Sequence, residues 1–152
     1  MSIHLPNNLT AQLADLAKQY DAGDLVQKIE NYKNALAQLE AATAVYSAAP
    51  TDTLYRDGLL HRFEFTVELA CKSMKEYLED QGIVLTIASP RRILKEAYAV
   101  GVVHDEDIWI KILTAHNLTS DVYDEATADE IAHRICSEFL APFTALAEFY
   151  SE

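Results

Sequence analysis

The stretch from His116 to Glu125 combines several side chains that could do chemistry. Its sequence, HNLTSDVYDE, contains an imidazole, a carboxamide, two hydroxyls, a phenol and carboxylates. An imidazole or a carboxylate can transfer protons in catalysis, and a phenol becomes a nucleophile when a neighbouring base takes its proton. The same residues also suit a helix end, a turn and a helix cap, with the Tyr123 ring packed on the fold. The residues alone leave both interpretations open.

Two charged runs are further candidates for a site. Arg91 and Arg92 follow Ser89-Pro90, and their guanidinium groups could bind a phosphate or the carboxylates of a partner. The alternative is that both arginines are solvated surface residues. The run from His104 to Asp107 has side chains that bind metals, but consecutive residues cannot converge from one face of a helix. Because acidic residues stabilise the first turn of a helix, we expect this run to begin a helix, and we predict no metal site and no cofactor.

The composition predicts that helices position these residues. The chain has 152 residues, which fits one domain, and it contains 22 alanines but only four glycines and four prolines. Cys71 and Cys136 have no metal-binding spacing, so we expect them to be free thiols. No leader-like segment or membrane-spanning apolar stretch is visible in the sequence, and we therefore expect a cytoplasmic protein without a membrane partner.

The charge is strongly negative but unevenly distributed. A net charge of −12 disfavours non-specific binding to nucleic acid through bulk charge. Residues 56–95, however, hold seven of the twelve lysines and arginines against six acidic residues. A locally neutral or basic face therefore remains possible within this segment.

Hydrophobic spacing predicts an all-α, antiparallel, up-and-down four-helix bundle with two shorter helices appended. Gly23 is expected to break the first helix from the second, so residues 1–23 are predicted to be a helical extension of a bundle domain formed by residues 24–152. The predicted helices are 8–20, one from Asp24 through Leu39, the longest from Thr51 or Thr53 to about Gln81, 90–100, one from Asp105 or Asp107 towards Asn117, and one from Thr127 through Phe143, which Pro142 can kink.

The run from Arg56 to Lys72, RDGLLHRFEFTVELACK, closely resembles the long helix of the nucleotidyltransferase substrate-binding protein family. That family is a branch of the HEPN superfamily of helical bundles. The resemblance covers about residues 25–150, and later blocks match the family in the same order: Ser89-Pro90-Arg91, Asp107-Ile108-Trp109, Asn117-Leu118-Thr119-Ser120 and Tyr123-Asp124-Glu125.

The resemblance implies a prokaryotic, cytoplasmic homodimer with a small stand-alone nucleotidyltransferase as its partner. It also implies RNA or a nucleotide at the dimer cleft. In related HEPN proteins, an arginine, four residues, a histidine, one residue and a tyrosine form the motif. Arginine and histidine cut RNA without a metal, and in some pairs the nucleotidyltransferase attaches AMP to the tyrosine and silences the toxin.

This chain retains the spacing of the motif but changes two of its three residues. His116 stands where the family has arginine, Asp121 stands where it has histidine, and Tyr123 remains. Histidine lacks the permanent charge and the bidentate donors of arginine, and an aspartate is a weak general base near neutral pH. A swapped pair, with Asp121 orienting His116 as the base, would still need a cation, which Arg62 or Arg92 could supply.

The sequence therefore favours a non-catalytic HEPN-like subunit that binds a minimal nucleotidyltransferase. In this interpretation His116 and Asp121 are degenerate catalytic positions, while Asn117, Ser120 and Tyr123 serve binding or modification, with Tyr123 accessible at the rim of a cleft. Two alternatives stay open: a metal-independent endoribonuclease toxin of such a pair, and a structural helical dimer with an unrelated role. The broad apolar stripe of residues 60–77 also predicts a two-fold dimer.

Overall fold

The structure, a computed structural model, describes residues 7–121 and 124–152, with side chains described at residue 12, from 24 to 119 and from 124 to 152. All regular elements in these residues are helical, which confirms the all-α prediction. In chain order they are α1 (Asn7–Ala48), α2 (Thr53–Asp80), α3 (Pro90–Ala99), α4 (Glu106–Asp121), α5 (Glu125–Arg134), a π-helical turn (Ile135–Phe139) and α6 (Leu140–Tyr150).

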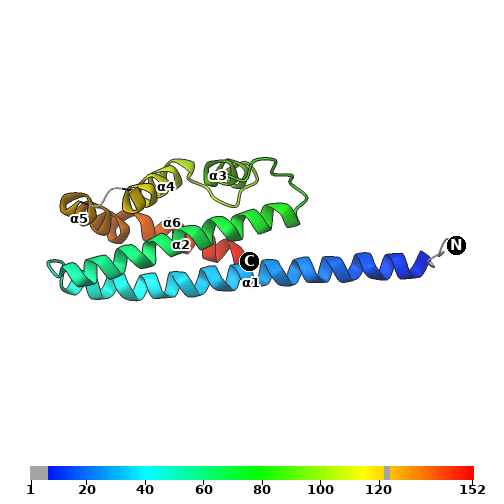
Figure 1. Ribbon diagram of the computed structural model, residues 1–152, viewed down its shortest axis with the longest axis horizontal. Coiled ribbons are helices and arrows are strands. Elements are labelled where there is room, and N and C mark those ends of the chain that lie inside the picture. Colours follow the sequence, from blue (N-terminus) through cyan, green and yellow to red (C-terminus); the bar gives the residue numbers. More distant parts are fainter. Residues whose placement is uncertain (1–6, 122–123) are drawn as a thin grey trace.

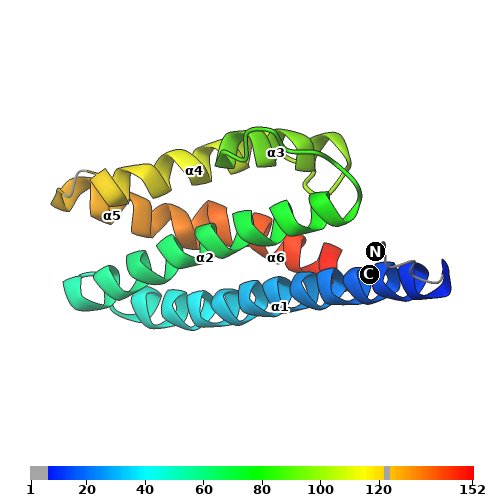
Figure 2. The ribbon, with the colours of Figure 1, turned by 45° about the vertical axis from the view of Figure 1, so that its right-hand side comes forward.

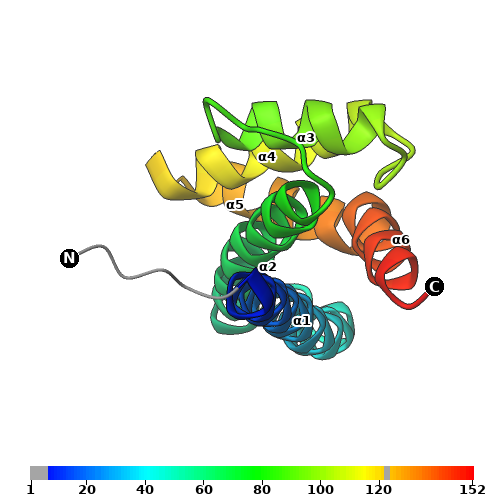
Figure 3. The same ribbon diagram turned by 90° about the vertical axis from the view of Figure 1, so that its right-hand side faces the viewer.

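The long helices pack as an antiparallel bundle around α2. Helices α1 and α2 form a hairpin, and α3 and α4 lie along the opposite side of α2 from α1 (Figures 1 and 2). Seen along the bundle in Figure 3, α6 lies beside the hairpin, and it packs against α1. Helix α2 therefore contacts α1, α3, α4 and α5, and its side chains supply much of the core.

Aromatic rings from α1, α2, α4 and the C-terminal helices fill the core. The rings of Phe63 and Phe139 stack with their centroids 5.8 Å apart, and Trp109 meets Phe143 edge-to-face at 5.4 Å. The hydroxyl of Tyr32 donates a 2.6 Å hydrogen bond to the carbonyl oxygen of Phe143. Burial of this phenol raises its pKa well above the usual range, so it stays a neutral donor and links α1 to α6.

Helix α1 runs without a break through Gly23, and the predicted interruption there is wrong. A glycine within a helix costs only about 1 kcal/mol relative to alanine. This cost is too small to interrupt a helix of 42 residues. As a result α1, and not α2, is the longest helix, and its N-terminal part projects past the other helices (Figure 1). The boundary between residues 1–23 and the bundle domain therefore lies inside a continuous helix and stays a prediction.

The ends of α2 and α3 follow from local chemistry. Asp52, and neither Thr51 nor Thr53, caps α2, because its carboxylate accepts hydrogen bonds from two backbone N–H groups. Ser89 caps α3 as predicted, with Pro90 in the first turn. Just beyond the end of each helix lies a glycine with a positive φ, 84° at Gly82 after α2 and 83° at Gly101 after α3, a conformation that glycine adopts without strain.

The C-terminal helices agree with the prediction only in part. Asp105, one of the two predicted residues, caps α4, but the helix continues past Asn117 to Asp121. The next helix starts at Glu125 rather than near Thr127, because Asp124 caps it by accepting a hydrogen bond from the Thr127 N–H at 2.9 Å. The Thr127 hydrogen bonds also hold the pKa of Asp124 below its usual value.

Most of the wide apolar stripe on α2 is buried in the core of the chain itself. Leu60, Phe63, Val67, Ala70 and Met74 are buried in the core described above. This burial removes the stripe as an argument for a dimer, so the expectation of a homodimer depends on the family resemblance.

Candidate functional site

A groove of about 570 Å³ lies between α2, α3 and α4. It brings together three of the sequence candidates, because Arg91 at the start of α3 and His116 and Asn117 on α4 all line it. Its remaining lining residues are Val67, Glu68, Cys71, Lys72 and Lys75 from α2, Ala88, Ser89, Pro90 and Ile93 around the start of α3, and Leu113 and Asn117 from α4. We define this set as the α2–α4 groove.

His116 faces a carboxylate across the groove. Its Nε2 atom lies 3.6 Å from Oε1 of Glu68, and the imidazole is 18% exposed. The structure thus places a carboxylate from α2 beside His116, while the side chain of Asp121, the partner suggested by the sequence, lies outside the described part. Glu68 was not among the site residues predicted from the sequence. The available signal was its position four residues before Lys72, within the run that resembles the family.

Three cationic side chains line the groove. Lys72 and Lys75 lie three residues apart on α2, so they share one face of that helix, and Arg91 lies across from them on α3. The sequence identified Arg91 but missed both lysines. Three of the seven basic residues of segment 56–95 thus line one groove, in a chain whose net charge is −12.

Arg92 and Arg62 do not line this groove. The Arg92 guanidinium pairs with Glu96 of its own helix at 3.1 Å. The Arg62 guanidinium donates a 2.7 Å hydrogen bond to the carbonyl oxygen of Gln38, which directs it towards α1. Neither arginine therefore lines the groove beside His116, whereas Lys72 and Arg91 do so among the described residues.

The other motif residues are placed only in part. Asn117 lines the groove beside His116. Ser120 and Asp121 belong to α4, but their side chains lie outside the part that the structure describes, and Tyr123 lies outside it entirely. The accessibility of the Tyr123 hydroxyl therefore stays a prediction.

Cys71 lines the groove and is partly buried against the core. Burial raises the pKa of its thiol to about 12, and the charge of Glu68 acts in the same direction. Because only the thiolate is nucleophilic, Cys71 acts at neutral pH as a small apolar lining residue.

A buried arginine fixes the position of α5. The Arg56 side chain is only 3% exposed and contacts three carboxylates: Glu125 at 2.6 Å, Asp129 at 2.9 Å and Asp57 at 3.1 Å. These contacts join the first turns of α2 and α5, next to the segment that contains Tyr123. We call Arg56 and its three carboxylates the Arg56 cluster; the sequence analysis did not anticipate it.

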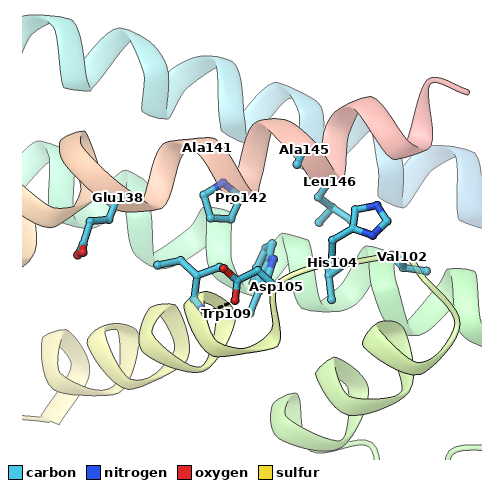
Figure 4. Close-up of a pocket in the computed structure, with 11 residues that line it drawn as sticks. Val102, His104, Asp105, Trp109, Glu138, Ala141, Pro142, Ala145 and Leu146 are labelled. Atoms are coloured by element: carbon cyan, nitrogen blue, oxygen red, sulfur yellow. Dashed lines mark hydrogen bonds between the residues drawn. The ribbon is translucent and has the colours of Figure 1, made fainter.

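A second cavity, of about 400 Å³, lies between the start of α4 and α6. Figure 4 shows Trp109, Pro142 and Leu146 around it, with His104 and Asp105 at its edge. Asp105 is engaged in capping α4, with its Oδ1 atom 3.2 Å from the Ile108 nitrogen. Within the described residues no group of three metal-binding side chains gathers at any point, and no helix there is long and apolar enough to cross a membrane.

The arrangement of the helices is that of the HEPN-like helical domains. The structure superposes on HI0074 from Haemophilus influenzae, described as the substrate binding domain of a nucleotidyltransferase, with a TM-score of 0.71 and 26% identity over 82% of this chain and 99% of that chain. A Shewanella oneidensis HEPN toxin, solved tri-AMPylated and in complex with MNT antitoxin, shares the fold with a TM-score of 0.68 and 15% identity over 84% of this chain and 96% of that chain.

The chain belongs to the nucleotidyltransferase substrate-binding protein family. The sequence model of that family, described as "Nucleotidyltransferase substrate binding protein like", matches residues 27–152. A probable ribonuclease HepT from Haemophilus influenzae is 32% identical over 100 residues, which make up 64% of this chain and 67% of that protein. These findings confirm the family resemblance and the HEPN-like fold expected from the sequence.

Proposed function

We propose that this chain is a non-catalytic HEPN-like subunit that binds a small nucleotidyltransferase. Family membership supports a role beside such an enzyme. The fold supports it further, because the similar Shewanella HEPN toxin was solved together with an MNT antitoxin. The two free cysteines fit the reducing cytoplasm in which we expect the pair to work.

The environment of position 116 is the observation that supports a subunit without ribonuclease activity. Ribonuclease chemistry of the HEPN type needs a guanidinium at this position to stabilise charge on the scissile phosphate. Here an imidazole occupies it and faces the carboxylate of Glu68 at 3.6 Å. A carboxylate at this place repels a phosphodiester, and Asp121 supplies no imidazole at the second motif position.

The alternative is a metal-independent endoribonuclease, and one observation favours it. Glu68 could orient His116 as a general base, while Lys72 and Arg91 line the same groove and could stabilise charge. The name of the Haemophilus relative points in the same direction. The two functions differ in one measurable property, which is cleavage of RNA by the purified chain in the presence of EDTA.

Co-expression tests the proposed binding role. The chain and a tagged small nucleotidyltransferase encoded beside it should co-purify and elute together from a sizing column. An unrelated acidic helical protein of similar size, expressed with the same tagged enzyme, serves as the control. Elution of the two components as separate species at micromolar concentration would contradict the proposal.

A further inference from the structure

The N-terminal part of α1 projects from the bundle. Residues 7–23, which we call the α1 arm, continue the helix past the other helices (Figure 1). The part of the chain that matches the family model begins at residue 27, so the arm lies outside it. Gln12, the one arm residue whose side chain the structure describes, is exposed. Because a helix in a protein takes most of its stability from the packing of an amphipathic face, an arm with such a face needs a partner.

The sequence of the arm places an apolar stripe along one side of this helix. Four large apolar residues follow one another at steps of four, three and four positions: Leu9, Leu13, Leu16 and Tyr20. At about 100° per residue, all four positions fall within about 60° around the helix. The three charged residues of the arm, Asp15, Lys18 and Asp21, lie about 80° or more from each of these positions. The stripe is therefore an uncharged seam with the spacing that pairs two helices.

The stripe runs along the side of α1 opposite to the side that the bundle covers. Further along the helix, Tyr32, Leu36 and Leu39 are buried in the core. Leu16 and Leu36 are 20 positions apart, which places them about 160° apart around an ideal α-helix. The same angle separates Tyr20 from Leu36. A partner of the stripe must therefore come from outside this chain.

Two properties of the arm fit a second copy of the same chain. The order of the steps, four, three and four, reads the same in both directions. In an antiparallel pair related by a two-fold axis, Leu9 therefore lies opposite Tyr20 of the second copy, and Leu13 lies opposite Leu16. The arm also contains only two aspartates and one lysine, in a chain whose net charge is −12. Two arms can therefore meet with little electrostatic repulsion.

We propose that the α1 arm is a self-association surface, through which two chains pair by antiparallel contact of their apolar stripes. The two bundle domains then lie at opposite ends of the pair, because each arm extends away from its own bundle. The contact uses no residue of the bundle domain, which leaves that domain available to a nucleotidyltransferase. The inference goes beyond the docking role proposed above and does not depend on it.

Light scattering of the full-length chain at micromolar concentration tests the pairing. We expect the variant with Leu13→Asp and Leu16→Asp to have half the mass of the unmodified chain, because carboxylates cannot be buried in the seam without partners. The variant with Ala11→Asp and Ala14→Asp adds the same charge outside the stripe, so it is the matched control and should keep the mass of the unmodified chain. Circular dichroism shows whether the two variants have the same helical content.

Disulfide cross-linking tests the direction of the pair. In the antiparallel arrangement, position 13 of one chain lies opposite position 16 of the other. An oxidised mixture of Leu13→Cys and Leu16→Cys chains, one of them carrying a mass tag, should therefore give mixed dimers, whereas each variant alone should not cross-link through the arm. The unmodified chain, which contains Cys71 and Cys136 as its two cysteines, is the control for cross-links elsewhere.

Three results would overturn the proposal. The first is an equal mass for the unmodified chain and for the variant with Leu13→Asp and Leu16→Asp. The second is cross-linking of Leu13→Cys or Leu16→Cys with itself rather than in the mixture, which would show parallel helices. The third is a stripe variant that keeps its own mass but no longer co-purifies with a nucleotidyltransferase, which would make that enzyme the partner of the arm. The mass and the cross-links are measured on the chain alone, so they stand whether or not the complex with the enzyme forms.

Discussion

At the scale of single residues, the side chain at position 116 is the feature that distinguishes the two proposed functions, a ribonuclease and a binding subunit. The sequence showed which side chains of the motif had changed, because that needs only spacing. It could not show that Glu68 faces position 116, since that contact joins residues on α2 and α4 that are 48 positions apart in the chain. Contacts between helices of this kind are where the sequence-based description of the site was incomplete.

We predict that the purified chain does not cleave RNA, and that His116→Arg together with Asp121→His restores metal-independent cleavage. Loss of one charge-stabilising donor lowers a rate about 10²–10³-fold, and loss of a general base lowers it about 10²–10⁴-fold. An arginine at position 116 would pair with Glu68, so the triple variant that adds Glu68→Gln should be more active than the double variant. RNA cleavage in the presence of EDTA, followed on gels, is measured for the unmodified chain, the double variant and the triple variant.

Cleavage by the unmodified chain that resists EDTA and disappears in His116→Ala would show that the His116–Glu68 pair is catalytic. In that case Glu68→Gln in the otherwise unmodified chain should reduce the rate as well. Cleavage that EDTA abolishes would point away from both mechanisms.

Tyr123 gives the second prediction at this scale. If AMP transfer occurs in this pair, its phenol is the acceptor, because it is the motif group that this chain retains. A free phenol with a pKa near ~10 is a weak nucleophile, so a carboxylate such as Asp121 or Asp124 would have to accept its proton. Mass spectrometry of the chain after co-expression with the nucleotidyltransferase should find an AMP adduct on Tyr123 and none in Tyr123→Phe; adducts confined to other tyrosines would contradict the assignment.

At the scale of the elements, caps that depend on adjacent residues could be predicted and contacts that depend on distant residues could not. Ser89-Pro90 and Gly101 marked the ends of α3 correctly, because a cap and a left-handed glycine act within a few residues. Gly23 suggested a break where none exists, because the helix propensity of one residue is small beside the length of α1. The Arg56 cluster was missed because two of its three carboxylates come from α5, far away in the sequence.

We predict that Arg56→Met lowers the free energy of unfolding by about 1.5–3 kcal/mol, the size of one hydrogen bond to a charged group. The estimate stays at this level although Arg56 makes several such contacts, because its carboxylate partners are more than half exposed and remain hydrated when it is removed. Urea unfolding measures the change. Arg92→Met, which removes a partly exposed pair within α3, is the comparison and should change stability by less than about 1 kcal/mol; equal effects would show that the Arg56 cluster does not hold α5 in place.

At the scale of the whole molecule, the family match and the core begin at nearly the same place. The match starts at residue 27, and the first fully buried side chain in the described part is Tyr32. We therefore predict that a chain lacking residues 1–23 unfolds at the same temperature as the complete chain. A fall of several degrees in calorimetry would show that the N-terminal part of α1 stabilises the bundle.

The fifth prediction concerns assembly. We expect a homodimer in solution, as the family resemblance implies, and light scattering at micromolar concentration should give about twice the mass of the chain. Comparison with the chain lacking residues 1–23 locates the dimer contact. If the dimer persists, it forms through the bundle domain. If the dimer is lost, it forms through the N-terminal part of α1. A monomeric mass for the complete chain would contradict the prediction.

The π-helical turn keeps the apolar residues of the C-terminal helices on one buried face. Ile131, Ile135, Phe139 and Phe143 are each at most 2% exposed, although they follow one another at steps of four residues. Each such step advances about 40° around an ideal α-helix, so three steps would rotate Phe143 about 120° away from Ile131. The turn, closed by the Leu140 N–H on the Ile135 carbonyl oxygen, accommodates one extra residue and sets the helix back by about 100°. An insertion in the ancestral gene would leave such a trace, and deleting one residue here should give a regular α-helix that keeps both phenylalanines on the buried face.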